Sequence, residues 1–362
     1  MTEHITGDAT STPGETPNRG DTARVEAAAR ETARESNPVL AVLRSNAGRN
    51  SGLVVGLLLL CIVGAATAGD RFTSTDNALT ILRLAATTGV VSIGMTFVIT
   101  GGGIDLSVGA ILALSSVWCT TLATQQTAED SHWIVMVFVA LAVGAGCGLV
   151  NGLFIAYGGI VPFIMTLAML ASARGLAEII SDKKTQIVQV PGFADFFDSE
   201  ILGIEVSVYV FALVALVGWV LLNRTTFGRR TIAVGGNPEA ARLAGINVKW
   251  HTVLLYALSG LCCGLAAIML TSQATSAQAA MANLYELDAI AAAIIGGTLL
   301  SGGRGTIIGA LFGVLVFSTI TNLFAINNLS TEVQNMVKGG IIVAAVLIQQ
   351  FRYRSLTQLL KR

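Results

Sequence analysis

Charged residues are scarce in this sequence of 362 residues. Lys, Arg, Asp and Glu together make up 12% of it, hydrophobic residues make up 53%, and the mean hydropathy is +0.70. An ordinary soluble domain, in which about a quarter of residues are charged, is therefore excluded. The formal net charge is zero, which argues against nucleic-acid partners because these normally require a basic face. The composition predicts a polytopic membrane protein.

Motifs of catalytic and metal chemistry are also missing. The sequence holds only three histidines, no H-E-x-x-H and no G-x-x-x-x-G-K-[ST] phosphate loop, so neither a metalloprotease nor ATP binding by that device is expected. The five cysteines lie in apolar stretches without ligand-like spacing, which predicts small core residues and no disulfide framework. They are Cys61, Cys119, Cys147, Cys262 and Cys263. We expect neither a metal, a cofactor nor catalytic residues in this chain.

Long apolar runs are abundant and predict an all-α protein with about ten transmembrane helices. The runs lie near 52–69, 78–100, 107–124, 133–156, 161–180, 206–222, 252–271, 286–299, 305–325 and 333–351.

The distribution of Lys and Arg predicts the orientation of these helices. With the N-terminus inside, sixteen basic residues fall in cytoplasmic segments and three in outer segments, as the positive-inside rule requires. No basic start followed by an apolar core occurs within the first 30 residues, so we expect the first span to be an uncleaved anchor. Residues 1–50 are expected to form a disordered cytoplasmic tail, residues 51–351 the transmembrane domain, and residues 352–362 a cytoplasmic C-terminal tail.

A polar island at 223–251 interrupts the apolar sequence and contains a short helix with specified ends. Asn237 can cap the first amides, Pro238 suits the first helical position, and Gly245 suits a left-handed exit. Glu239 complements the positive end of the helix dipole. So short a helix is unstable alone in water, and its small face suits a groove. That face comprises Ala240, Ala241 and Ala244. The local pattern also fits an ordinary capped helix in a loop.

Glycines interrupt two of the apolar segments. Gly101, Gly102 and Gly103 separate the second and third runs, and Gly296 and Gly297 shorten the eighth. Broken segments in corresponding halves are typical of transporters, where they mark the path or moving parts. An offset of 200 residues relates two pairs of dipeptides and suggests an internal duplication. The pairs are Gly102-Gly103 with Gly302-Gly303, and Gly109-Ala110 with Gly309-Ala310.

Several of these segments resemble the ribose-type permeases, the inner-membrane subunits of bacterial ABC importers for monosaccharides. The resemblance spans Leu53 to Phe351, and the long polar N-terminal tail is its main departure. It rests on Gly94–Gly109, Phe227-Gly228-Arg229, Asn237–Gly245, Tyr285–Ala292, Gly296-Gly297-Thr298 and Gly302–Gly305.

The resemblance implies a function for the polar island. Asn237, Pro238, Glu239, Ala240, Ala241, Arg242 and Gly245 match the coupling helix that docks on a separate ATPase subunit. It also implies ATP and magnesium on that ATPase, an external sugar-binding protein, and a second permease copy or paralogue. The expected protein is a multi-pass subunit of the bacterial inner membrane that carries a pentose, hexose or related small sugar.

Polar residues inside the spans are candidates for the sugar path that the resemblance implies. They are Thr96, Thr100, Ser107, Asn151 and Asn322. Each can equally serve a contact between helices. We expect Arg174 and Glu178, four residues apart, to neutralise each other, and Asp105 to end a helix or tie down the glycine loop.

Two alternatives to an ABC permease stay open for the function. An ion-coupled carrier would use a buried charge near the midplane, and a channel or scaffold would not accumulate solute.

In the segment 182–205, acids surround Phe193, Phe196 and Phe197. This pattern predicts an amphipathic stretch at the outer interface, or an acidic edge that receives a binding protein.

Overall fold

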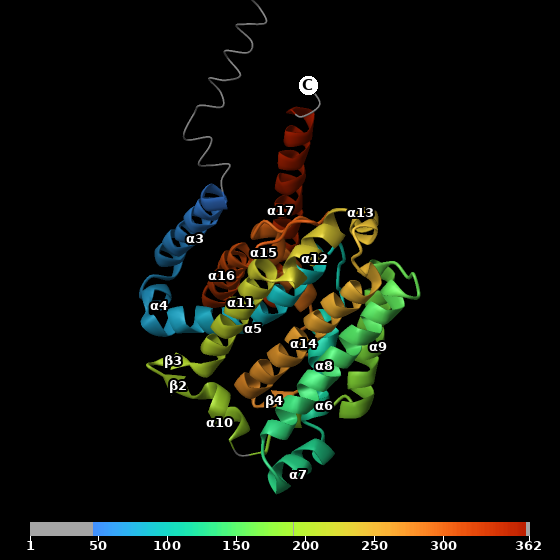
Figure 1. Ribbon diagram of the computed structural model, residues 1–362. Helices are drawn as coiled ribbons and strands as arrows, with labels where there is room; N and C mark the ends of the chain where they lie inside the picture. The colour runs from blue at the N-terminus through green and yellow to red at the C-terminus, as the bar shows by residue number, and fades with distance from the viewer. Residues whose placement is uncertain (1–45, 191, 360–362) are drawn as a thin grey trace, which may run out of the picture. The chain divides into compact units, whose positions relative to one another are not determined.

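The computed structural model describes residues 46–190 and 192–359, and almost all of them belong to helices or short turns (Figure 1). Residues 1–45, most of the segment expected to be a disordered tail, lie outside the described residues. Helix α3 (Asn46–Ala68) starts before the boundary expected at residue 50. The chain divides into two units, Met1–Ser51 and Gly52–Arg362, and the second holds the helices discussed below.

The long helices follow the apolar runs of the sequence. In chain order they are α5 (Thr75–Thr100), α6 (Val108–Cys119), α8 (Ile134–Ala156), α9 (Pro162–Ser181), α11 (Val206–Arg224), α14 (Val248–Ala274), α15 (Tyr285–Ile295), α16 (Ile307–Ile326) and α17 (Thr331–Leu359). Shorter helices lie between them: α4 (Asp70–Thr73), α7 (Leu122–Asp130), α10 (Phe193–Asp198), α12 (Thr226–Gly236) and α13 (Pro238–Leu243). Two antiparallel pairs of short strands join β1 (Gln186–Ile187) to β4 (Ser276–Ala277) and β2 (Glu200–Ile201) to β3 (Ile204–Glu205).

Each predicted apolar run coincides with a helix or a helix pair, but fewer than ten qualify as complete spans. Seven helices in the described part of the chain are long and apolar enough to cross a membrane, or eight if α6 and α7, which meet at 55°, count as one. Helix α15 has 11 residues, about 16 Å at 1.5 Å per residue, so the helix alone is shorter than a bilayer core of about 30 Å. Helix α17 continues through 352–359, past the expected boundary at 351. The count of ten stays a prediction.

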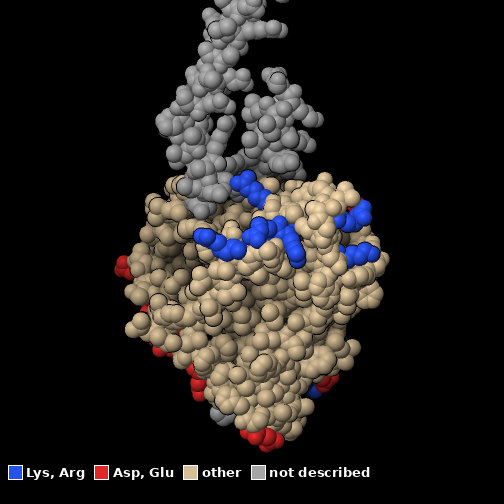
Figure 2. Space-filling view, in the orientation of Figure 1, with Lys and Arg blue, Asp and Glu red and all other residues tan. Residues whose placement is uncertain are grey.

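The connecting segments gather at two opposite ends of the second unit, as the alternating order of spans predicts. At one end the backbone of Gly302 lies against Gly102 and Gly235. At the other, Gln125 Nε2 donates to the Ile187 carbonyl at 3.1 Å, and β1 pairs with β4. On the face of the molecule shown in Figure 2, Lys and Arg lie towards the upper end, and Asp and Glu lie towards the lower end. Segments expected on one side of the membrane therefore meet, and the assignment of either end to the cytoplasm stays a prediction.

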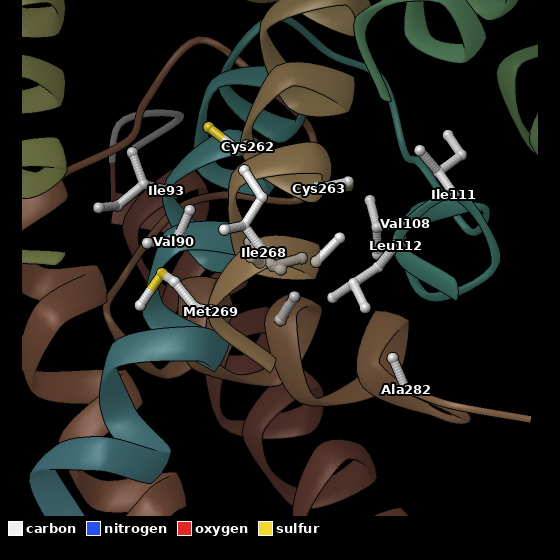
Figure 3. Packing of buried hydrophobic residues seen from close by; sticks show 14 of the residues in the cluster. Val90, Ile93, Val108, Ile111, Leu112, Cys262, Cys263, Ile268, Met269 and Ala282 are labelled. Carbon is white, nitrogen blue, oxygen red and sulfur yellow. The ribbon is translucent and has the colours of Figure 1, made fainter. Parts of the chain in front are cut away.

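Helix α14 lies between α5 and α6 and carries much of the apolar core (Figure 3). Its side chains meet those of α5 on one side and those of α6 on the other. The buried residues shown are Val90 and Ile93 of α5, Val108, Ile111 and Leu112 of α6, and Cys262, Cys263, Ile268 and Met269 of α14. Cys119 is also buried and Cys147 half-buried, but Cys61 is exposed, so the prediction of a core position was wrong for Cys61.

Glycines let α8 and α14 approach until their backbones touch. A methyl group on Gly148 would lie 2.2 Å from the Tyr256 carbonyl oxygen, and one on Gly260 would lie 2.1 Å from the Gly144 carbonyl oxygen. Close packing at small residues is one source of attraction between helices in lipid, where burial of apolar surface adds little. This contact fixes α14 beside α8.

The phenylalanines of the segment 182–205 pack inside the protein. Phe193 and Phe197 are buried, and the Trp133 ring lies 5.1 Å from the ring of Phe196 and 6.4 Å from that of Phe197. Only Phe196 of the three is exposed. Two of the three rings are thus buried inside the protein, next to Trp133 at the start of α8, and the position of this segment at the outer interface stays a prediction.

Replacing Gly148 by Ala is expected to lower the thermal unfolding midpoint of the detergent-solubilised protein. The added methyl group has no space at the contact with α14, and overpacking of this kind costs about 1–3 kcal/mol. Gly146→Ala is the matched control, since nothing lies within 4 Å of a methyl group there. Equal midpoints for the two variants would show that the α8–α14 contact does not limit stability.

Candidate functional site

The capped helix expected in the polar island is α13, and its ends form as the sequence predicts. Asn237 Oδ1 accepts the Ala240 amide at 3.0 Å, and Pro238 occupies the first turn. Gly245 has a φ of 81°, and its amide donates to the Arg242 carbonyl at 3.0 Å. Glu239 forms an exposed ion pair with Arg242 at 3.0 Å. These bonds hold α13 as a defined turn at the end of the molecule.

The exposed face of α13 differs from the predicted one. Ala241 is only 4% exposed and packs on its own protein, whereas Ala240 and Ala244 are exposed. Leu243 is 80% exposed. The apolar side chain that α13 offers to a partner is therefore Leu243, which the pattern of alanines did not single out.

A second helix of the island, α12, was not predicted and connects α13 to the helix bundle. The Thr231 hydroxyl lies 2.9 Å from His251 Nε2 of α14, and the Phe227 ring lies 6.1 Å from that of Phe97 in α5. Asn237 ends α12 and begins α13. Arginine and lysine side chains are exposed around these helices (Figure 2). They are Arg224, Arg229, Arg230, Arg242, Lys249 and Arg304.

Helices α5 and α15 end in the same way. The Gly102 amide donates to the Ile99 carbonyl at 2.9 Å, and Gly102 has a φ of 86°. At the end of α15 the Gly297 amide donates to the Ile294 carbonyl at 2.8 Å, and Gly297 has a φ of 89°. Such positive φ values favour glycine. Both halves of the chain thus contain a helix, a glycine exit and a following helix.

The predicted correspondence of residues between the halves needs correction. Gly102 is structurally equivalent to Gly297 at the helix exits, so Gly302 and Gly303 have no counterparts in Gly102 and Gly103. Instead, Gly302 touches Gly102: a methyl group on Gly302 would lie 2.9 Å from the Gly102 Cα atom. The segment between α15 and α16 is longer than the one between α5 and α6. The extra residues bring the second break into contact with the first.

Asp105 ties down the first break, one of the two roles expected for it. This residue is fully buried. Its Oδ1 accepts both the amide and the hydroxyl of Ser107, at 3.0 and 2.5 Å, and its Oδ2 accepts the Ser259 hydroxyl at 3.1 Å. Asn151 Nδ2 donates to the Ser107 hydroxyl at 2.9 Å. These bonds fix the start of α6 between α8 and α14.

Charged side chains in the spans are bound to groups from other elements. Arg174 Nη1 donates to the carbonyl oxygens of Ala279 and Met281. Glu178 is exposed and makes no direct ion pair with Arg174, and the expected neutralisation of the two charges stays a prediction. Lys338 Nζ of α17 contacts Asp288 Oδ2 of α15 at 2.9 Å. Paired charges of this kind are usual inside membrane proteins. They fix the start of α15 against α9 and α17.

The predicted path residues are all buried within this chain. The hydroxyls of Thr96 and Thr100 donate to the carbonyls one turn earlier in α5, at 2.7 and 2.5 Å. Asn322 Nδ2 donates to Asn77 Oδ1 at 2.8 Å. Ser107 and Asn151 belong to the Asp105 network. Each side chain makes at least one hydrogen bond inside the protein, and a role in passage stays a prediction.

A helical membrane bundle with two interrupted segments and an exposed capped helix has the architecture of a transport protein. The family model described as branched-chain amino acid transport system / permease component matches residues 77–346. The chain belongs to this permease family and is a multi-pass protein of the bacterial inner membrane.

Named relatives match most of the chain. The ribose import permease protein of Bacillus subtilis is 42% identical over 301 residues, which cover 83% of this chain and 92% of the relative. The ribose import permease protein of Escherichia coli K12 is 36% identical over 300 residues, 82% of this chain and 92% of the relative. The D-allose transport system permease protein of the same strain is 35% identical over 294 residues, 81% and 89%. No solved structure matches the chain.

Replacing Ser259 by Ala is expected to destabilise the protein modestly. One interhelical hydrogen bond to Asp105 is lost, and such bonds are worth about 0.6–2 kcal/mol in membrane proteins. Asp105→Ala should cost more, because it leaves the buried hydroxyls of both Ser107 and Ser259 without their acceptor. The thermal midpoint in detergent measures both effects, with the exposed Ser172→Ala as control. A midpoint for Asp105→Ala equal to that of the control would contradict the assigned role of the network.

Proposed function

We propose that this chain is the permease subunit of an ATP-driven importer for a monosaccharide. The relatives named as ribose and D-allose permeases support a pentose or hexose as substrate. Galactose and L-arabinose permeases also match, at 33% and 35% identity. An ion-coupled carrier receives no support from these relatives, and the L-arabinose relative is named an ABC transporter permease.

The observation that carries this proposal is the exposed, capped helix α13 at the basic end of the bundle. The rest of this chain buries Ala241 and leaves the Leu243 side chain exposed. Two defined ends and one uncovered apolar side chain suit docking into a groove of a partner. In this proposal the partner is a separate ATPase that binds ATP and magnesium, and α13 transmits its movement.

The basic end of the bundle is the cytoplasmic end in this proposal. Exposed Arg and Lys residues gather there, as the positive-inside rule requires. The island at 223–251 and the two glycine breaks then face the ATPase. Both chain termini are cytoplasmic if α17 completes a tenth crossing.

The opposite, acidic end faces the external binding protein in this proposal. Exposed carboxylates lie on α7 and around α10 and β2 (Figure 2). They are Glu129, Asp130, Asp182, Asp195 and Glu200. Opposite charges steer such encounters and fix their orientation. A second permease copy or a paralogue would complete the path for the sugar between two subunits.

Replacing Leu243 by Asp is expected to weaken attachment of the ATPase at least tenfold and to abolish ATP-driven uptake. The change puts a charge on the apolar side chain that α13 offers to its partner. Leu202→Asp is the matched control for ATPase attachment alone, because Leu202 is 94% exposed at the opposite end. Copurification of the ATPase and uptake of labelled ribose, allose, arabinose and galactose into proteoliposomes give the readouts. Full attachment of the ATPase to the Leu243→Asp variant would refute docking through this face.

Cysteine labelling tests the proposed orientation. In a background without native cysteines, Ala240→Cys and Gln126→Cys place thiols on exposed positions at the two ends. A membrane-impermeant maleimide added to intact cells should label position 126 only, and permeabilised cells should label both. Labelling of position 240 in intact cells would reverse the orientation, and labelling of both would break the alternation of spans.

A further inference from the structure

Three backbone segments meet without intervening side chains at the basic end of the bundle. They are the exit of α5 at Gly102, the end of α12 at Gly235, and Gly302 of the segment after α15. A methyl group on Gly235 would lie 1.9 Å from the Thr100 carbonyl oxygen and 2.6 Å from the Gly303 amide nitrogen. One on Gly302 would lie 2.7 Å from the Gly235 carbonyl oxygen. We call this contact the glycine junction.

A hydrogen bond closes the glycine junction. The Gly303 amide donates to the Thr100 carbonyl at 2.8 Å, across 203 positions of the chain. The loop that carries Gly303 is folded on itself, since the Gly302 amide donates to the Leu299 carbonyl at 2.9 Å and the Leu299 amide to the Arg304 carbonyl at 3.0 Å. Both breaks are thereby joined to each other as well as to α12.

The glycine junction lies directly next to α13 in the chain. Asn237, which caps α13, donates its amide to the Ala233 carbonyl of α12 at 3.0 Å. Only Gly236 separates Asn237 from Gly235. Closely packed protein has low compressibility and transmits strain. A displacement of α13 that carries α12 with it must therefore move both breaks or open the junction.

We infer that the glycine junction transmits movement of α13 to both broken segments at once, with Gly102, Gly235 and Gly302 as its positioning residues. This inference rests on the proposed docking of α13 on an ATPase. Because the exits of α5 and α15 meet at one point, a single coupling helix per subunit can act on both halves of the chain.

The test compares two adjacent glycines of α12. Gly235→Ala forces a methyl group into the junction, whereas a methyl group on Gly236 finds its nearest neighbour, the Gly303 Cα atom, at an ordinary 3.9 Å. For Gly235→Ala we expect normal insertion and a fully attached ATPase. We expect stimulation of ATP hydrolysis by loaded binding protein to disappear, and uptake of labelled sugar to fall at least tenfold. Gly236→Ala should behave like the parent. Equal stimulation and uptake for the two variants would overturn the inference.

A second pair of variants covers the case in which Gly235→Ala fails to insert. Gly302 and Gly159 both have positive φ, 79° and 68°, but only Gly302 has neighbours that a methyl group would strike. Alanine strains the backbone at both Gly302 and Gly159, but it disturbs the glycine junction only at Gly302. Gly302→Ala should lose stimulation with the ATPase attached, and Gly159→Ala should keep it. If both junction variants fail to insert while both controls insert, the junction serves folding alone and the inference falls.

These outcomes differ from a failure of the proposed function. If α13 does not dock on an ATPase, Leu243→Asp keeps the ATPase attached and active. If α13 docks but the junction is not the connection, Leu243→Asp loses the ATPase while Gly235→Ala retains stimulated hydrolysis and uptake.

Discussion

Direct contact between backbones at three glycines is the constraint on which the rest of this structure depends. Gly235 has no room for a side chain beside the Thr100 carbonyl oxygen, so α12 can leave the bundle only along the exits of the two broken segments. Positive φ at Gly102 and Gly302 allows the chain to turn there. The position of α13 follows, because it begins three residues after Gly235. The exposed helix and the interrupted spans are therefore parts of one assembly.

Buried polar contacts hold parts of the two broken segments against neighbouring helices. A polar group in the hydrocarbon core has no water to bind and must find a partner within the protein. Asp105 fixes the start of α6 through Ser107 and Ser259. The bond between Lys338 and Asp288 fixes the start of α15. Asp105 therefore holds the first break next to the junction, whereas Asp288 holds α15 at the helix end away from its break.

Local chemistry in the sequence was sufficient to predict much of this architecture. The apolar runs placed the long helices, and Asn237, Pro238 and Gly245 placed α13, since capping depends only on neighbours in the chain. Features that depend on distant contacts were not predictable. Whether Ala241 or Leu243 faces outward depends on how α12 packs against α14. The partners of Arg174 are carbonyls more than a hundred residues away.

The internal duplication shows the same limit. Identity of dipeptides suggested an offset of 200 residues, but equivalent helix exits lie at Gly102 and Gly297. The backbone hydrogen bonds show that Gly297 is the structural equivalent of Gly102, whereas Gly302 is a residue that contacts Gly102. The dipeptide Gly235-Gly236 was visible in the sequence. Its contact with the two breaks was not, because these residues are far apart in the chain.

Distances between spin labels in the reconstituted importer, measured with and without ATP, test the central claim most directly. Labels on exposed Ala240 of α13, Ser301 of the second break and Gln126 at the opposite end leave the glycines untouched. If the junction connects α13 to the breaks, the distance from 240 to 301 stays constant while both distances to 126 change together. If the distance between labels 240 and 301 changes while the distance between labels 301 and 126 stays fixed, α13 moves without the breaks, and the account is contradicted.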